Sequence, residues 1–190
     1  MSKTKIENIV FLCQKGDKQA QKTLFELYAH KMMFVCKRYF SSEEDCSDVF
    51  MEGFMKVFLA IDKYKFTDEK SFSLWVRKII INHCLNTLKK NNRLLLLDKQ
   101  MQEEVLEANK EQSKEYFQSQ FTQEEIFGCL DKLPKNLKTV FNMLVIDEFS
   151  QKEVAQRLET TEGVIKVYAH RARQILKQEL EKILNNRQSK

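Results

Sequence analysis

The fold of this chain is decided by residues 150–176, which read SQKEVAQRLETTEGVIKVYAHRARQIL. Ser150 and Glu153 have the spacing of a capping box, which predicts a short helix that ends near Leu158. A turn of three residues then leads into a second helix, which Thr161 is expected to cap. Apolar residues recur along this second helix at steps of four, three and four and form one stripe: Ile165, Ala169, Ala172 and Leu176. The pattern predicts a helix-turn-helix.

The other side of the second helix is basic. Lys166, His170, Arg173 and Lys177 repeat the spacing of the apolar stripe. A helix that reads the major groove needs one side packed on its own domain and the other free for base edges and phosphates. We therefore predict a surface for duplex DNA that comprises Thr161, Glu162, Lys166, His170, Arg171, Arg173 and Lys177. A helical hairpin whose basic side simply faces water is the alternative interpretation.

Composition extends the helical prediction to the whole chain. Four glycines and one proline in 190 residues are too few for the tight turns of a β-rich domain. Further capping boxes are expected at Ser41–Glu44 and Thr122–Glu125, and Pro134 is expected in the first turn of a helix. Other helices are predicted over 17–39, 41–61 and from Ser71 or Ser73 to about Lys90, and the last helix is predicted to end near Leu184. We predict an all-α protein.

Charge divides the chain into two basic blocks and an acidic spacer. Residues 1–97 carry 17 basic and 11 acidic side chains, residues 98–131 carry 3 and 9, and residues 132–190 carry 12 and 7. Within the spacer, residues 98–120 have too few apolar side chains to build a core. We predict two small helical domains, 1–92 and 122–190, joined by a flexible acidic linker, 93–121. Two basic blocks favour nucleic acid as a partner, although ordinary solvated helix faces give the same balance.

The first basic block contains an acidic stripe. Asp45, Asp48 and Glu52 lie at i, i+3 and i+7 of the helix predicted to follow Ser41. Carboxylates repel DNA, so this stripe indicates docking to a basic protein partner. The preference of acidic residues for a helix N-terminus is the alternative explanation, and it accounts for Asp45 but not for Glu52, two turns further along.

Aromatic, amide and lysine side chains follow the acidic stripe. Unstacked bases stack on aromatic rings, amides pair with base edges, and lysines hold phosphates. We predict a surface for single-stranded DNA that comprises Tyr64, Phe66, Phe72, Trp75, Lys78, Asn82, Asn86, Lys89 and Lys90. Packing in the core is the alternative for Phe72 and Trp75.

No motif indicates an enzyme. His30, His83 and His170 are far apart, and the sequence contains no glycine-rich phosphate loop, nucleophile elbow or metal-ligand spacing. We therefore expect no catalytic residue, cofactor or metal site. Five dispersed cysteines indicate buried free thiols in a reducing cytoplasm. Neither a signal peptide nor a membrane-spanning segment is expected, because the apolar runs are too short.

Both basic blocks resemble the extracytoplasmic-function (ECF) sigma factors of bacterial RNA polymerase. In the second block the resemblance rests on Leu133-Pro, Phe149-Ser-x-x-Glu153-Val-Ala155, Glu162-Gly-x-Ile165-Lys and His170-Arg-Ala-Arg173. In the first block it rests on Gly16-Asp-Lys-Gln-Ala20, Glu44-Asp-x-x-Asp48-x-x-x-Glu52-x-Phe54 and Phe72-x-x-Trp75-x-x-x-Ile79-x-x-Asn82. The chain departs from the family pattern at Met51, Asn86 and Glu159, where Gln, Asp and Gly are usual, and at Val164, Val167 and Tyr168, where more polar residues are usual.

This resemblance implies a role for each surface. The acidic stripe would dock on core RNA polymerase, on the coiled coil of its β′ subunit, and the β subunit would also be contacted. The aromatic and amide surface would capture the melted −10 element of a promoter, and the basic helix would read the duplex −35 element. The acidic linker would lie along the path of the nascent RNA, unless it is only a disordered tether. An anti-sigma factor is a further implied partner. A stand-alone helix-turn-helix regulator and a helical adaptor without a nucleic-acid role are the competing hypotheses.

Overall fold

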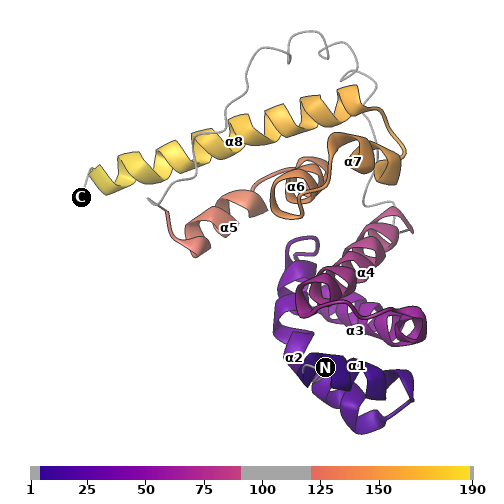
Figure 1. Cartoon of the computed structure of the whole chain (residues 1–190). Helices are drawn as coiled ribbons and strands as arrows, with labels where there is room; N and C mark the ends of the chain where they lie inside the picture. Colours follow the sequence, from indigo (N-terminus) through magenta and orange to yellow (C-terminus); the bar gives the residue numbers. More distant parts are fainter. Residues whose placement is uncertain (1–4, 91–120, 189–190) are drawn as a thin grey trace. The chain divides into compact units, whose positions relative to one another are not determined.

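The computed structural model describes residues 5–90 and 121–188, which belong to two compact helical units (Figure 1). The described residues contain no β-strand, so the predicted all-α class and the division into two helical domains are confirmed. Apart from Phe121, the predicted linker lies outside the described residues, and the limits of the two domains stay a prediction. None of the described helices has a stretch that is long and apolar enough to cross a membrane.

The first unit consists of helices α1 (Lys5–Gln14), α2 (Lys18–Lys37), α3 (Glu43–Ala60) and α4 (Glu69–Lys90), with a 3-10 turn, η1 (Ile61–Lys63), after α3. Helices α2, α3 and α4 pack on one another, and α1 packs on α2 and η1. The sequence prediction misses α1, although its buried residues have helical spacing: Ile6, Ile9, Val10 and Cys13. The core of the unit is apolar, and its fully buried side chains include Leu24, Phe54, Val57, Phe72, Ile80 and Ile81.

Two helix starts in this unit differ from the prediction. Ser42, not Ser41, is the N-cap of α3, because its side chain accepts a hydrogen bond from the Asp45 backbone N–H (3.3 Å); the predicted Ser41–Glu44 capping box is therefore wrong. Helix α4 begins at Glu69, before the predicted Ser71. The Asp68 carboxylate accepts hydrogen bonds from the Ser71 backbone N–H (2.9 Å) and hydroxyl (2.6 Å), which satisfies the first turn earlier.

Gly53 lets α3 and α4 approach closely. A Cβ at this position would lie only 2.7 Å from Ile80 Cδ1 and 3.6 Å from His83 Cδ2. Ile80 is fully buried, so its side chain has little room to move away. Close helix packing therefore accounts for this glycine, and the contact brings the side chains that flank Gly53 on α3 next to those of α4.

The second unit consists of α5 (Gln123–Asp131), α6 (Lys135–Phe141), a π-helical turn, η4 (Asn142–Ile146), α7 (Gln151–Leu158) and α8 (Glu162–Gln188). The long helix α8 packs against α5, α6 and α7. The predicted capping boxes at Thr122–Glu125 and Ser150–Glu153 are confirmed. Pro134 is the residue before α6 rather than part of its first turn, and α8 continues to Gln188 rather than ending at Leu184.

The turn between α7 and α8 has a left-handed residue. Glu159 has φ 55° and ψ 45°, a conformation that glycine adopts without steric cost and other residues adopt at a cost of roughly 1–2 kcal/mol. The Thr160 backbone N–H bonds to the Ala155 carbonyl (2.9 Å), and Thr161 Oγ1 accepts from the Val164 N–H (3.4 Å) at the start of α8. The predicted helix-turn-helix is confirmed as α7, this turn and α8.

Candidate nucleic-acid interface and docking surface

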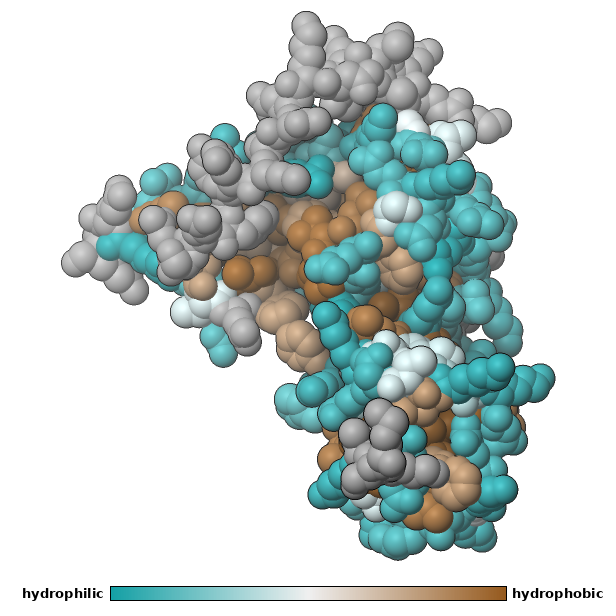
Figure 2. All heavy atoms as spheres, viewed as in Figure 1, coloured by the Kyte–Doolittle hydropathy of each residue, from teal (hydrophilic) through white to brown (hydrophobic). Residues whose placement is uncertain are grey.

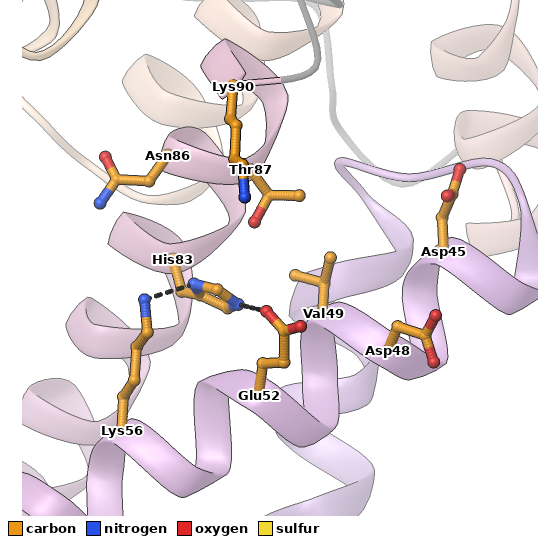
Figure 3. A pocket seen from close by; sticks show the side chains of 9 residues that line it. All are labelled: Asp45, Asp48, Val49, Glu52, Lys56, His83, Asn86, Thr87 and Lys90. Carbon is orange, nitrogen blue, oxygen red and sulfur yellow. Dashed lines mark hydrogen bonds and ion pairs between the residues drawn. The ribbon is translucent and has the colours of Figure 1, made fainter.

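The acidic stripe lies on α3 beside a hollow between α3 and α4. Asp48 and Glu52 are exposed and Asp45 is half-buried. All three line the hollow, which has a volume of about 420 Å³, and its far side comes from α4 (Figure 3). The remaining lining residues are Val49 and Lys56 of α3 and His83, Asn86, Thr87 and Lys90 of α4.

A buried histidine links two charged residues of this hollow. His83 is only 6% exposed, and its Nε2 lies 2.9 Å from Glu52 Oε2 while its Nδ1 lies 2.8 Å from Lys56 Nζ (Figure 3). Burial lowers the pKa of His83, and the Lys56 cation lowers it further; the Glu52 carboxylate acts in the opposite direction. The sequence analysis assigned no role to His83, since only its distance from the other histidines could be read from the sequence.

Two residues of the predicted single-stranded-DNA surface line the same hollow as the acidic stripe. Asn86 and Lys90 are exposed on α4 and face the hollow with Asp45, Asp48 and Glu52. The stripe of cations and amides predicted along α4 therefore borders the acidic residues directly. Lys78 is also exposed on α4, whereas Asn82 and Lys89 are half-buried.

The aromatic residues of that predicted surface form one cluster in which Phe72 is central. Its ring centroid lies 5.2 Å from that of Tyr64, 6.2 Å from that of Phe66 and 5.6 Å from that of Trp75. Phe72 is 0% exposed and also packs on Tyr28 in the core. Because no base can reach a fully buried ring, the prediction of Phe72 as a stacking residue is wrong. Tyr64, Phe66 and Trp75 are half-buried around it and keep part of their surface in solvent.

Three exposed apolar side chains on α3 form a row that the sequence analysis did not identify. Met51, Met55 and Leu59 are 50%, 63% and 79% exposed and follow each other at steps of four. In the face shown in Figure 2, hydrophobic areas lie among hydrophilic side chains. Their regular spacing is visible in the sequence, but the same spacing is also typical of a buried helix face.

The predicted duplex-DNA surface lies on α8. The apolar stripe opposite to it is buried, with Ile165, Ala169, Ala172 and Leu176 at most 3% exposed. Lys166, Arg173, Lys177, Thr161 and Glu162 are exposed and His170 is half-buried. Arg171 is half-buried and lies about 100° further round the helix than His170, so it does not share the line of the other cations.

The unusual apolar residues of α8 are buried. Val164, Val167 and Tyr168 are 5%, 3% and 3% exposed. The apolar part of α8 is therefore wider than the single stripe that the sequence analysis identified.

No metal-ion cluster of histidine, cysteine or carboxylate side chains occurs within 5–90 and 121–188. The five cysteines are free and buried, as predicted. Burial raises the pKa of Cys13 and of Cys46 to about 11, so both thiols are protonated at neutral pH.

Two protein-family models match the two units, and known proteins are similar to the chain over most of its length. Residues 24–94 match the model of sigma-70 region 2, and residues 123–176 match that of sigma-70 region 4. The ECF RNA polymerase sigma factor SigW of Bacillus subtilis (strain 168) is 26% identical over 180 residues, which cover 88% of this chain and 92% of that protein. The ECF RNA polymerase sigma-E factor of Escherichia coli (strain K12) is 24% identical over 181 residues, which cover 90% and 92%.

The fold also matches a solved structure. The sigma factor RpoE from Bartonella quintana, solved in complex with the anti-sigma factor NepR, superposes with a TM-score of 0.50 at 16% identity, over 84% of this chain and 96% of that chain. At this identity the likeness concerns the fold alone. The two family models together span most of the described residues, in the order region 2 and then region 4. The chain belongs to the ECF sigma factors of the sigma-70 family.

Proposed function

We propose that this sigma factor binds core RNA polymerase through the acidic stripe of α3 and holds promoter DNA on α4 and α8. The observation that carries the proposal is the exposure of Asp48 and Glu52 in a chain whose net charge is +5. An acidic surface in a basic protein suits a basic protein partner and repels DNA, which separates the two kinds of contact on the same unit. The partner for this surface would be the β′ coiled coil.

The −10 element would be held as single-stranded DNA by the partly exposed aromatic rings and by α4. Moving a base out of the duplex costs a few kcal/mol, and stacking on an aromatic ring returns roughly 1–3 kcal/mol per base. Tyr64, Phe66 and Trp75 offer ring surface for stacking, and Lys78 offers a cation for the backbone. Phe72 belongs to the core and packs against the rings of Tyr64 and Trp75.

The −35 element would lie against the exposed side of α8. Lys166, Arg173 and Lys177 can neutralise phosphates or pair with guanine edges, and Thr161 and Glu162 at the start of the helix would be nearest to the bases. Contacts of this kind release counterions, so binding should weaken steeply as salt is raised. The chain would supply positioning and strand opening in the cytoplasm, while the polymerase supplies the chemistry. An anti-sigma factor is proposed as a further partner.

The test is a promoter-binding and promoter-opening assay with and without core RNA polymerase. We expect specific binding and opening only when both proteins are present. If the chain alone binds promoter DNA specifically and polymerase adds nothing, it is a stand-alone regulator and the proposal fails.

A charge reversal tests the docking surface. The double variant Asp48→Lys, Glu52→Lys should weaken polymerase binding by at least about 100-fold, because two attractive contacts become repulsive. The matched control is Glu26→Lys, Glu181→Lys, which changes the net charge equally at exposed positions outside all predicted surfaces. Equal polymerase affinity of the two variants would contradict the docking assignment.

A further inference from the structure

His83 is a buried titratable residue at the centre of the proposed docking surface. Its side chain faces the hollow between α3 and α4, and it contacts one residue of the acidic stripe directly, Glu52 (Figure 3). The Glu52 side chain itself is 63% exposed. A residue on the surface is thus held by a residue in the core.

The hydrogen-bond partners define the protonation state of the imidazole. The ammonium of Lys56 has only donors, so Nδ1 of His83, 2.8 Å away, must accept with a free lone pair. The proton of the neutral ring is then on Nε2, which donates to Glu52 Oε2 at 2.9 Å. The ring is neutral in this arrangement, in agreement with the lowered pKa of His83.

We propose that neutral His83 is a positioning residue for polymerase docking: through its Nε2–H it holds the Glu52 carboxylate in a fixed orientation, and protonation of the ring weakens docking. This inference rests on the proposed docking function of α3. It concerns a residue that would act through Glu52 and would not itself touch the polymerase.

Preorganisation of Glu52 is the physical reason why the bond to His83 would raise the affinity for polymerase. An exposed glutamate samples many rotamers, and ordering such a side chain on binding opposes association. The hydrogen bond from His83 to Glu52 Oε2 already holds the carboxylate in one orientation before the partner binds. Its other oxygen, Oε1, has no hydrogen-bond partner in the described parts of the chain and is available to a cation of the partner.

Protonation changes both contacts of the ring. A doubly protonated imidazole cannot accept from Lys56, so the Nδ1 contact becomes a repulsion between two cations. The positive ring then neutralises Glu52, and the acidic stripe loses charge towards a basic partner. The charged residues around the hollow are Asp45, Asp48, Glu52 and Lys56 on α3 and Lys90 on α4. Docking should therefore weaken as the pH falls through the lowered pKa of His83.

The experiment measures the dissociation constant of the full chain and core RNA polymerase, without DNA, between about pH 7.5 and about pH 5, because the lowered pKa of His83 requires a range that extends well below the ordinary histidine value. His83→Gln places a non-titrating amide donor near Glu52, and His83→Phe fills the same space without any hydrogen bond. His30→Gln is the matched control, since His30 is exposed on α2.

Each variant has a defined expected result. At pH 7.5 we expect His83→Phe to weaken binding about threefold to tenfold, the range for ordering one long side chain, and His83→Gln to stay within about twofold of the natural chain. Towards about pH 5 the natural chain and His30→Gln should lose affinity by the same factor as each other, whereas His83→Gln, measured with the same polymerase, should lose less. In a Glu52→Ala background, His83→Phe should have no further effect.

Two results would overturn the inference. One is a pH dependence that is identical in His83→Gln and in the natural chain. The other is an effect of His83→Phe that persists undiminished in the Glu52→Ala background, which would show a general structural role. The charge reversal of Asp48 and Glu52 separates this failure from that of the proposed function: if the reversal leaves polymerase affinity unchanged, the docking surface itself is misassigned.

Discussion

Helices α4 and α8 carry the predicted DNA surfaces of their units, and they divide buried from exposed residues in different ways. On α8 a buried stripe of small and branched side chains faces its neighbours, and cations line the opposite side. On α4 the buried residues include an aromatic ring and a histidine, and exposed Asn86 and Lys90 share a hollow with carboxylates of α3. The surface of α8 is thus largely a property of one helix, whereas that of α4 is assembled with α3 and a loop.

The difference has a physical origin in what each surface is expected to bind. Duplex DNA presents a regular groove, and one helix with separated faces fits it. Flipped bases need concave surroundings and ring surface, which one helix does not provide alone. Side chains from several elements must then be brought together, and their burial depends on neighbours that are distant in sequence.

The largest expected effect tests the separation of faces on α8 with two adjacent residues. Ala172 is 0% exposed, so Ala172→Asp buries an unpaired charge and should destabilise the second unit by about 3–5 kcal/mol. Arg173 is exposed, so Arg173→Glu should change stability by no more than about 0.5 kcal/mol but should strongly weaken −35 binding by the complete polymerase. Denaturant unfolding and promoter-binding measurements would check both. Equal loss of stability in the two variants would contradict the assignment of the faces.

A second pair of variants tests the aromatic cluster of the first unit. Phe72 is fully buried, so Phe72→Ala should cost about 3–5 kcal/mol of unfolding free energy. Trp75 is half-buried, and Trp75→Ala should cost clearly less but should reduce promoter opening, measured at temperatures where the variant is folded. Denaturant unfolding of the two variants measures stability, and the chemical reactivity of unpaired −10 thymines measures promoter opening. If Trp75→Ala is as destabilising as Phe72→Ala and folded protein opens promoters normally, Trp75 belongs to the core alone.

The same difference explains how much could be predicted from the sequence. The helix-turn-helix and two capping boxes are confirmed because each depends on residues close together in the chain, such as Ser150 and Glu153. The buried stripe of α8 follows from helical spacing alone. Even the left-handed turn residue, Glu159, stands where the family pattern indicated glycine.

The first unit was harder to predict because its features depend on contacts between elements. Phe72 and Trp75 are one helical turn apart, and only the packing of α2 and the preceding loop makes one fully buried and the other half-buried. His83 forms its contacts with residues 27 and 31 positions away. The prediction chose Ser41 instead of Ser42 as the cap of α3 because the two adjacent serines offer the same side chain, and the sequence does not distinguish them.

The smallest expected effect compares the same substitution in the two units. Both Gly53 and Gly128 lie inside helices, where alanine is favoured over glycine by up to about 1 kcal/mol. A Cβ at Gly128 would meet nothing within 4 Å, so Gly128→Ala should stabilise the second unit by about that amount. A Cβ at Gly53 would lie 2.7 Å from the buried Ile80 side chain, and overpacking of about 1–3 kcal/mol should exceed the gain in helix propensity.

If the two substitutions change the unfolding free energy in opposite directions, helix packing requires the glycine at position 53 but not the one at position 128. Gly53→Ala should in addition push α3 away from α4 and disturb the contact between Glu52 and His83, so its polymerase affinity should fall even where the unit is folded. A stabilising effect at both glycines would contradict this account, because it would mean that α3 and α4 can move apart without loss. In that case the hollow between them would not be rigid enough to orient a carboxylate.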